Sequence, residues 1–276
     1  MVWKRALLPP LLASALLITP SAHAQASDEP NTSGGLPEQS EQLAYEVRFR
    51  GARVASIRHH LGCTTKNHRA AAMIATSHGM AEDIHSFHIR LDSFFTPDSV
   101  TPMQGRTKIT EEGKTRAYKS TFTSTPAVKV EAKIFDTQKR QQRYNLPDEG
   151  HDLLSWMLHL RAANTRWEKG QTQSYYIWDG WKLVQLEAKI AGQQILETPH
   201  GKYKTWAVDV KRTRMKYDKT ANTFKSSAEP DKLGTLWFTT GADHILVGMD
   251  FDSRIGMANI RLTRAEREPC KEKRAP

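Results

Sequence analysis

The sequence predicts a mainly β fold, with a large curled antiparallel sheet or partial barrel and one main helix packed at its concave face. Apolar and polar residues alternate with period 2 through most of the chain. Turn-forming residues separate the alternating runs, and only one window, about residues 152–163, shows helical spacing instead. A dozen or so antiparallel strands must close, stack or curl, because exposed strand edges invite aggregation.

The first 24 residues have the pattern of a cleavable export signal. Lys4 and Arg5 form a positive start, an apolar stretch runs from Ala6 to Ile18, and Ala22-His23-Ala24 is a small-x-small cleavage site. The apolar stretch has about 13 residues, against roughly 20 for a membrane-spanning helix. We therefore expect a periplasmic protein without a transmembrane span after cleavage.

Composition divides the remainder into three parts. Residues 25–42 are polar and rich in Gly, Pro and Ser, which predicts a flexible leader. Residues 43–264 are expected to form a single β-rich domain, and residues 265–276 a basic C-terminal tail. The whole chain carries a formal charge of +10, and about +8 remains without Lys4 and Arg5. The basic residues are spread along the sequence, which favours a solvated surface over a nucleic-acid site.

The expected strands of the first half follow from alternation. Leu43, Tyr45, Val47 and Phe49 share one face, and a second run extends from Val54 to Leu61 after Gly51. Glu111-Glu112-Gly113-Lys114 predicts a hairpin turn between 108–110 and 116–122. Further strands are expected around 84–91, 128–134 and 144–146.

A helix and a second set of strands follow. Leu153, Trp156, Met157 and Leu160 have helical spacing, and Asp152 is placed to cap the helix. Strands are then expected at 174–178 and 181–190, joined by an Asp179-Gly180 turn, and at 194–198 after a turn at Ala191-Gly192. The remaining expected strands are 203–210, 234–239, 245–251 and 257–262.

Two cysteines, Cys63 and Cys270, lie near opposite ends of the expected domain. In an oxidising compartment a disulfide between them would tie the C-terminal tail to an early strand. The sequence leaves two separate thiols equally open, since it does not show whether the two Cα atoms come within bonding distance.

No common catalytic signature is present, so no enzyme activity and no cofactor are expected. His85 and His88 would lie on opposite faces of a strand, which argues against a metal site. Asp250 and Asp252 would share one face of a strand and would suit acid–base chemistry, but solvated charges on a polar face are the preferred interpretation.

Indole side chains carry much of the apolar area. Tryptophan most often fills a core, yet it also lines sites for lipids and glycans. The residues predicted to line a ligand cavity are Trp156, Leu160, Trp178, Trp181, Trp206 and Trp237.

An ordered set of motifs runs through the chain: Tyr45 to Gly51, the run Asp152 to Arg161, Gly170, Asp179-Gly180-Trp181-Lys182, Gly192, Glu197 to Tyr203, and Leu236-Trp237-Phe238 before Asp243. This set resembles the family known as domain of unknown function 3108. The resemblance covers most of residues 43–264 and implies exported bacterial proteins, with fold-level similarity to periplasmic lipoprotein carriers. The family has no established catalytic residues, so none is implied here.

Two functions are compatible with the sequence. The first is a non-enzymatic binding or carrier protein that holds a lipid-like apolar ligand against the concave sheet. The second is an envelope assembly or structural factor that docks another protein through its β surface. The choice depends on whether the interior is hollow or filled with side chains, which the sequence pattern leaves open.

Overall fold

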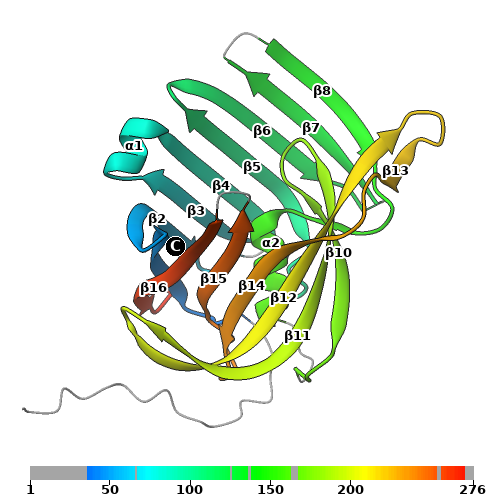
Figure 1. Cartoon of the computed structure of the whole chain (residues 1–276). Coiled ribbons are helices and arrows are strands. Elements are labelled where there is room, and N and C mark those ends of the chain that lie inside the picture. The colour runs from blue at the N-terminus through cyan, green and yellow to red at the C-terminus, as the bar shows by residue number, and fades with distance from the viewer. Residues whose placement is uncertain are drawn as a thin grey trace, which may run out of the picture.

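A computed structural model describes residues 36–65, 67–124, 126–135, 138–162, 167–253 and 256–270. Their strands form one 16-stranded sheet that curls around a central helix, α2, as Figure 1 shows. The strand order is β8-β7-β6-β5-β4-β3-β2-β1-β16-β15-β14-β12-β11-β10-β9, with β13 paired to β12. The sheet does not close into a barrel, and the predicted fold class is confirmed.

The first half of the sheet is an antiparallel meander of eight strands. Each strand pairs with the next in sequence. A five-residue helix, α1 (Met80–Ile84), lies between β3 and β4, so the strand expected from residue 84 begins only at Phe87. The strands are β1 (Ser40–Phe49), β2 (Ala52–Leu61), β3 (Arg69–Ser77), β4 (Phe87–Phe95), β5 (Pro102–Glu111), β6 (Lys114–Phe122), β7 (Ala127–Ile134) and β8 (Gln138–Asn145).

The second half begins with the short strand β9 and helix α2, and returns to the first half through the pairing of β16 with β1. The elements are β9 (Gly150–His151), α2 (Leu153–Ala162), β10 (Thr172–Trp178), β11 (Leu183–Thr198), β12 (Gly201–Asp218), β13 (Thr223–Ser226), β14 (Asp231–Thr239), β15 (Leu246–Ser253) and β16 (Gly256–Glu268). All of these pairs are antiparallel except β9 with β10.

The hairpin turns follow the sequence signals, with one exception. Glu112 and Gly113 both have positive φ, as a two-residue turn between β5 and β6 requires. In the turn predicted at Asp179-Gly180, the Asp179 carboxylate accepts hydrogen bonds from the backbone N–H groups of Trp181 and Lys182. The turn predicted at Ala191-Gly192 is wrong: β11 continues through it, and the pairing with β12 shifts register there as a β-bulge.

The expected domain limits differ from the observed strands. β1 begins at Ser40, inside the expected leader, and β16 extends to Glu268, inside the expected tail. These extensions pair with each other, Ser40 opposite Glu268. The export signal and residues 25–35 lie outside the described residues. No helix in the described part of the chain is long and apolar enough to span a membrane.

The apolar core has two parts. The larger one lies between α2 and the inner faces of strands from both halves. The smaller one joins the two ends of the sheet order, since it packs β7 and the residue after β8 against β10, β11 and β13. It consists of Val128, Val130, Leu146, Trp178, Leu183 and Phe224.

Cys63, just after β2, forms a disulfide with Cys270, just after β16. Their Cα atoms are 5.7 Å apart and 207 residues apart in sequence. The bridge fastens the end of the last strand to an early strand.

Candidate functional site

Helix α2 fills the concave face of the sheet. Its sequence, Leu-Leu-Ser-Trp-Met-Leu-His-Leu-Arg-Ala, is apolar around nearly the whole circumference, as is typical of a helix buried on all sides. The buried residues of α2 are Leu154, Ser155, Trp156, Met157, Leu158, Leu160 and Arg161.

Asp152 caps the start of α2, as predicted. Its Oδ1 accepts hydrogen bonds from the backbone N–H groups of Leu154 and Ser155, at 3.0 and 2.9 Å. Its Oδ2 accepts one from the Ser93 hydroxyl at 2.7 Å, which joins the helix start to β4. Burial raises the pKa of Asp152 to about 6, although these hydrogen bonds oppose the shift.

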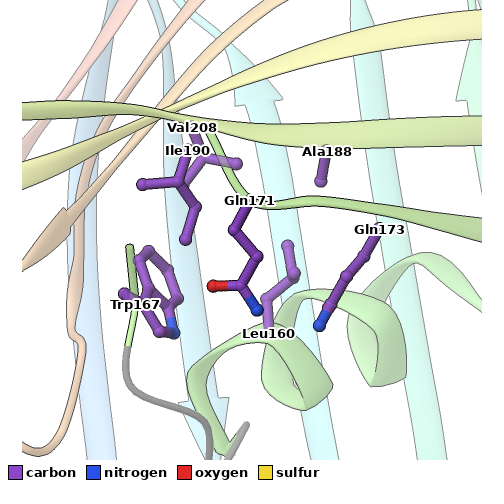
Figure 2. A pocket seen from close by; sticks show the side chains of 7 residues that line it. All are labelled: Leu160, Trp167, Gln171, Gln173, Ala188, Ile190 and Val208. Atoms are coloured by element: carbon purple, nitrogen blue, oxygen red, sulfur yellow. The ribbon is translucent and has the colours of Figure 1, made fainter. Parts of the chain in front are cut away.

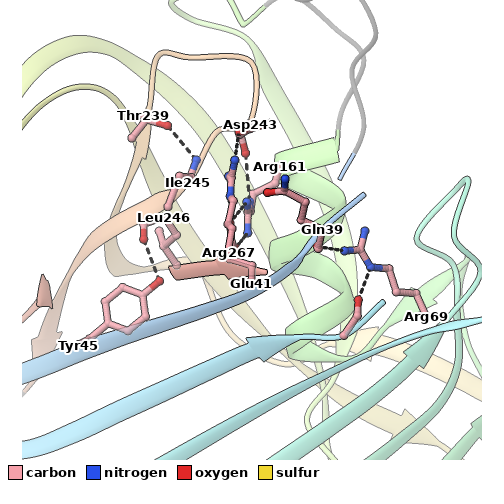
Figure 3. Close-up of polar contacts among 11 residues, drawn as sticks. Gln39, Glu41, Tyr45, Arg69, Arg161, Thr239, Asp243, Ile245, Leu246 and Arg267 are labelled. Carbon is pink, nitrogen blue, oxygen red and sulfur yellow. Dashed lines mark hydrogen bonds and ion pairs between the residues drawn. The ribbon is translucent and has the colours of Figure 1, made fainter. Parts of the chain in front are cut away.

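A buried ion cluster holds the other end of α2, as Figure 3 shows. The Arg161 guanidinium donates two hydrogen bonds to the Glu41 carboxylate, at 2.6 and 3.1 Å. The two side chains are 3% and 1% exposed, so the pair is almost fully withdrawn from water. Arg267 of β16 donates to the same carboxylate and to Asp243. Glu41 therefore has two cationic partners, of which only one lies on the helix.

The arginines control the ionisation of Glu41. Burial alone would raise its pKa, but the charges and hydrogen bonds of Arg161 and the charge of Arg267 lower the pKa to about 2. Since the folded pKa lies below the unfolded value, the pair stabilises the fold above about pH 4.5, and this contribution is lost as the pH falls towards 2.

Two uncharged groups also belong to the polar part of this interior. The Tyr45 hydroxyl donates to the carbonyl of Leu246 at 2.8 Å. His59 is buried near Arg161, and burial, with the Arg161 charge, lowers its pKa to about 4. Its Nδ1 has no hydrogen-bond partner among the described residues.

The cavities beside α2 are small. One is lined by Leu160, Trp167, Gln171, Gln173, Ala188, Ile190 and Val208 and has a volume of about 20 Å³ (Figure 2). A second, also of about 20 Å³, lies between α2 and β1, β2, β3 and β15 and is lined in part by His59 and Arg161. A third, of about 50 Å³, lies at the start of α2 and is lined in part by Asp152 and Leu154. These volumes hold only about one to a few water molecules each. In this conformation, side chains fill the space between α2 and the sheet.

Three of the predicted cavity residues lie near this interior. Trp156 and Leu160 are buried on α2, and Leu160 lines the cavity of Figure 2. Trp206 is partly buried on β12, with its ring centre 6.5 Å from that of Trp167. Trp167 also stacks on His244 at 4.5 Å. Because His244 directly follows Asp243, these aromatic rings lie close to the ion cluster that contains Asp243.

The other three predicted residues lie elsewhere. Trp178 belongs to the smaller core cluster, and its ring packs against Tyr144. Trp181 is 47% exposed in the turn between β10 and β11. Trp237 donates its indole N–H to Asp250. The structure therefore does not bring the six predicted residues into one cavity.

Asp250 is an ion-pair residue. Burial would raise its pKa, but hydrogen bonds from Arg261 and Asn259 and the Arg261 charge hold the pKa below its usual value. The Asp252 carboxylate is more exposed, and its Oδ2 lies 3.9 Å from Nζ of Lys232. The two carboxylates thus have separate cationic partners, and Asp250 is anionic at neutral pH rather than poised as a general acid.

The histidines considered as metal ligands do not converge either. His85 contacts Glu112, and His88 contacts Thr76. Within the described part of the chain, no group of three or more His, Cys, Asp or Glu side chains has the arrangement of a metal site.

Sequence reasoning missed Glu41, Arg161 and Arg267. A signal for Glu41 was available, because extending the alternation of Leu43 and Tyr45 one step backwards places residue 41 on the buried face. Arg161 was visible as a cation in the last turn of an apolar helix. Arg267 lies in the part of the sequence for which a C-terminal tail is predicted, and in the structure it belongs to β16.

The family model described as a protein of unknown function (DUF3108) matches residues 44–263. The chain belongs to this family. The match spans the strands from β1 to β16, and so includes α2 and most of the sheet around it. A search of curated protein sequences returned no match.

Three solved structures match this chain to different degrees. A β-barrel-like protein of domain of unknown function DUF1849 from Brucella abortus has a TM-score of 0.56 and 10% identity, over 84% of this chain and 99% of that one. A provisionally described lipoprotein from Parabacteroides distasonis has a TM-score of 0.34 and 10% identity, over 84% and 97%. A provisionally described exported protein with a YmcC-like fold from Bacteroides fragilis has a TM-score of 0.30 and 7% identity, over 85% of this chain and 99% of that one. At these identities the first likeness shows the fold alone.

Proposed function

We propose that this DUF3108 protein is a non-enzymatic periplasmic binding or carrier protein, and that it holds a lipid-like apolar chain against the concave sheet. The observation that carries the proposal is the position of α2. A helix apolar on nearly every side occupies the face that such a ligand would need. In this proposal α2 is a plug that the ligand displaces.

Displacement is required because the present cavities are too small. Sites for small molecules usually measure about 300–1,000 Å³, whereas the cavities lined by α2 that are described above have about 20, 20 and 50 Å³. The ion cluster is compatible with such a movement. If Arg161 leaves with α2, Arg267 stays paired with Glu41, so the buried carboxylate keeps a cationic partner.

The compartment is part of the same proposal. Residues 1–24 have the pattern of an export signal. The Cys63–Cys270 disulfide supports this location, because such bridges persist mainly in oxidising compartments.

The first experiment is native mass spectrometry of protein purified from the periplasm, followed by organic extraction. We expect a polypeptide that begins at Gln25 and an additional mass that extraction identifies as a lipid. Delipidated protein that takes up neither a fluorescent fatty acid nor a fluorescent phospholipid would contradict the carrier function.

The role of α2 is tested with Arg161→Gln, which removes the contact between α2 and Glu41. We expect faster uptake of the fluorescent lipid, together with faster hydrogen exchange in α2 when lipid is bound. Arg261→Gln is the matched control, since it removes an Arg–Asp pair from β15 and β16 without touching α2. Equal uptake by the two variants would show that α2 is a fixed part of the core.

The second candidate function is an envelope assembly factor that docks another protein through its β surface. It is favoured by β8, an eight-residue strand at one end of the sheet order, whose outer edge pairs with no described strand. Pull-down from envelope extracts, with a cross-linker placed on β8, tests this function. Recovery of no protein above background would argue against it.

A further inference from the structure

The outer face of β4–β8 carries a shallow, basic depression of about 830 Å³. It lies on the side of these strands opposite α2, because its lining side chains alternate with the buried residues Ser93 and Ser120 along β4 and β6. Two crosswise rows of side chains border it. One row contains both cations and carboxylates, whereas the other contains cations and no carboxylate.

The first row, called the paired row, has complementary charges. It runs across the five strands through Asp92, Arg106, Lys119, Glu131 and Gln141, in direct register. Asp92 stands opposite Arg106, and Lys119 lies 3.9 Å from Glu131. Arg106 also stands opposite Lys119, so the row has one like-charge pair between two pairs of opposite charge, and pairs of opposite charge stabilise a sheet.

The second row, called the basic row, has no carboxylate. It runs through Arg90, Lys108, Ala117, Lys133 and Lys139. Arg90 stands directly opposite Lys108, and Lys133 directly opposite Lys139, although like charges in such positions destabilise a sheet. Arg90 also pairs with Asp92 of the other row. The two rows together hold six cations and two anions.

An exposed aromatic residue lies beside the basic row. Phe135 is 50% exposed at the end of β7, and its backbone N–H bonds to Thr115 of β6. Phe135 directly follows β7, two residues beyond Lys133 in sequence, so an exposed aromatic residue lies beside one end of the strand that carries Lys133. A flat basic strip with an apolar side chain at its border is the chemistry of a protein that lies on an anionic membrane surface.

We propose that the basic row, with Phe135, docks the protein onto a membrane surface of anionic phospholipid headgroups. The five strands place the cations over about 19 Å, at roughly 4.8 Å per strand, which suits several phosphates on a plane better than a single anion in a pocket. Nucleic acid fits less well, because single strands are bound by several aromatic side chains on which successive bases stack, whereas the two rows themselves contain none and Phe135 is a single ring beside them. The proposal concerns the outer face and does not depend on a ligand under α2.

Sedimentation of the mature protein with vesicles tests the proposal. We expect binding to phosphatidylcholine vesicles that contain phosphatidylglycerol, weak binding to phosphatidylcholine alone, and a loss of binding as salt is raised. The variant Lys108→Glu/Lys133→Glu is expected to bind at least tenfold more weakly, since each lysine at such a surface contributes about fivefold.

The matched control is Lys189→Glu/Lys204→Glu, the same change of charge at two exposed positions on β11 and β12. It is expected to keep most of the vesicle binding. Lys108→Glu/Lys133→Glu is also expected to raise the melting temperature, because each new carboxylate faces a cation. Weaker binding by a more stable protein cannot be attributed to unfolding.

Three results would overturn the proposal. The first is an equal loss of vesicle binding in both double variants, which would indicate net charge alone. The second is release by inorganic phosphate beyond that by chloride at equal ionic strength, which would indicate a site for free phosphate. The third is tighter binding to DNA than to the anionic vesicles.

Discussion

Single residues at the two ends of α2 decide how the helix is held. Asp152 binds the helix start to β4, and Glu41 binds the helix end through Arg161. The cap was predictable, because Asp directly before an apolar helical pattern is a local signal. The ion cluster was not, because its members are separated by 120 and 226 residues in sequence.

The raised pKa of Asp152 predicts a specific dependence of stability on pH. Between the ordinary pKa of 3.8 and the folded value of about 6, the folded state binds more protons than the unfolded state. The contribution of Asp152 to stability therefore falls as the pH rises through this window, by up to about 3 kcal/mol.

Asp152→Asn keeps a side-chain oxygen for the helix cap and removes the ionisation. We expect the variant to gain stability relative to the parent as the pH rises from 4 to 7, measured by urea unfolding at several pH values. Glu149→Gln, on the exposed loop before β9, is the control. A stability difference between parent and Asp152→Asn that is constant over this range would contradict the prediction.

At the scale of elements, local pattern predicted strand identity well and strand length poorly. The helix and the turns at Glu112-Gly113 and Asp179-Gly180 are where the sequence placed them. β11 and β12 are longer than expected, at 16 and 18 residues. A bulge at Gly192 bends β11 without ending it, and β12 continues to Asp218, where its last residues pair with β13. Gly192 carries the same local signal whether the chain turns or bulges, so only the pairing with β12 separates the two.

Gly234 illustrates how one residue permits an irregular pairing. Gly234 pairs with Val210, next to the residue where the pairing of β12 with β14 shifts register. A Cβ atom on Gly234 would clash with the backbone carbonyl of Asp250. We expect Gly234→Ala to lose about 2–4 kcal/mol of stability in denaturant unfolding, because neither backbone can retreat. Gly241→Ala is the control, since a Cβ there meets no atom within 4 Å. Equal stability of the two variants would show that the β14–β15 pairing adapts.

At the scale of the whole molecule, the disulfide links distant parts of the chain. Because it closes a loop of 207 residues, it restricts the unfolded state strongly. We expect Cys63→Ser/Cys270→Ser to lose about 2–5 kcal/mol in the unfolding free energy. The reduced parent protein is expected to have the same unfolding free energy as the variant. Adding a reductant is expected to leave the unfolding free energy of the variant unchanged. A variant as stable as the oxidised parent would contradict this prediction.

The sequence by itself determined the β-rich fold class and the one main helix, because period-2 alternation, helical spacing and turn residues are local signals. The family was indicated by the resemblance of an ordered set of motifs. The sequence also predicted that the helix lies at the concave face, but it left open whether that interior is hollow. Only the tertiary structure decided that side chains fill the space around α2, that the six predicted cavity residues are dispersed, and that Glu41 is buried between two arginines. It also decided that cations spread along the sequence gather in one row across β4–β8. The physical reason is register: which side chains become neighbours across strands depends on the pairing of the whole sheet.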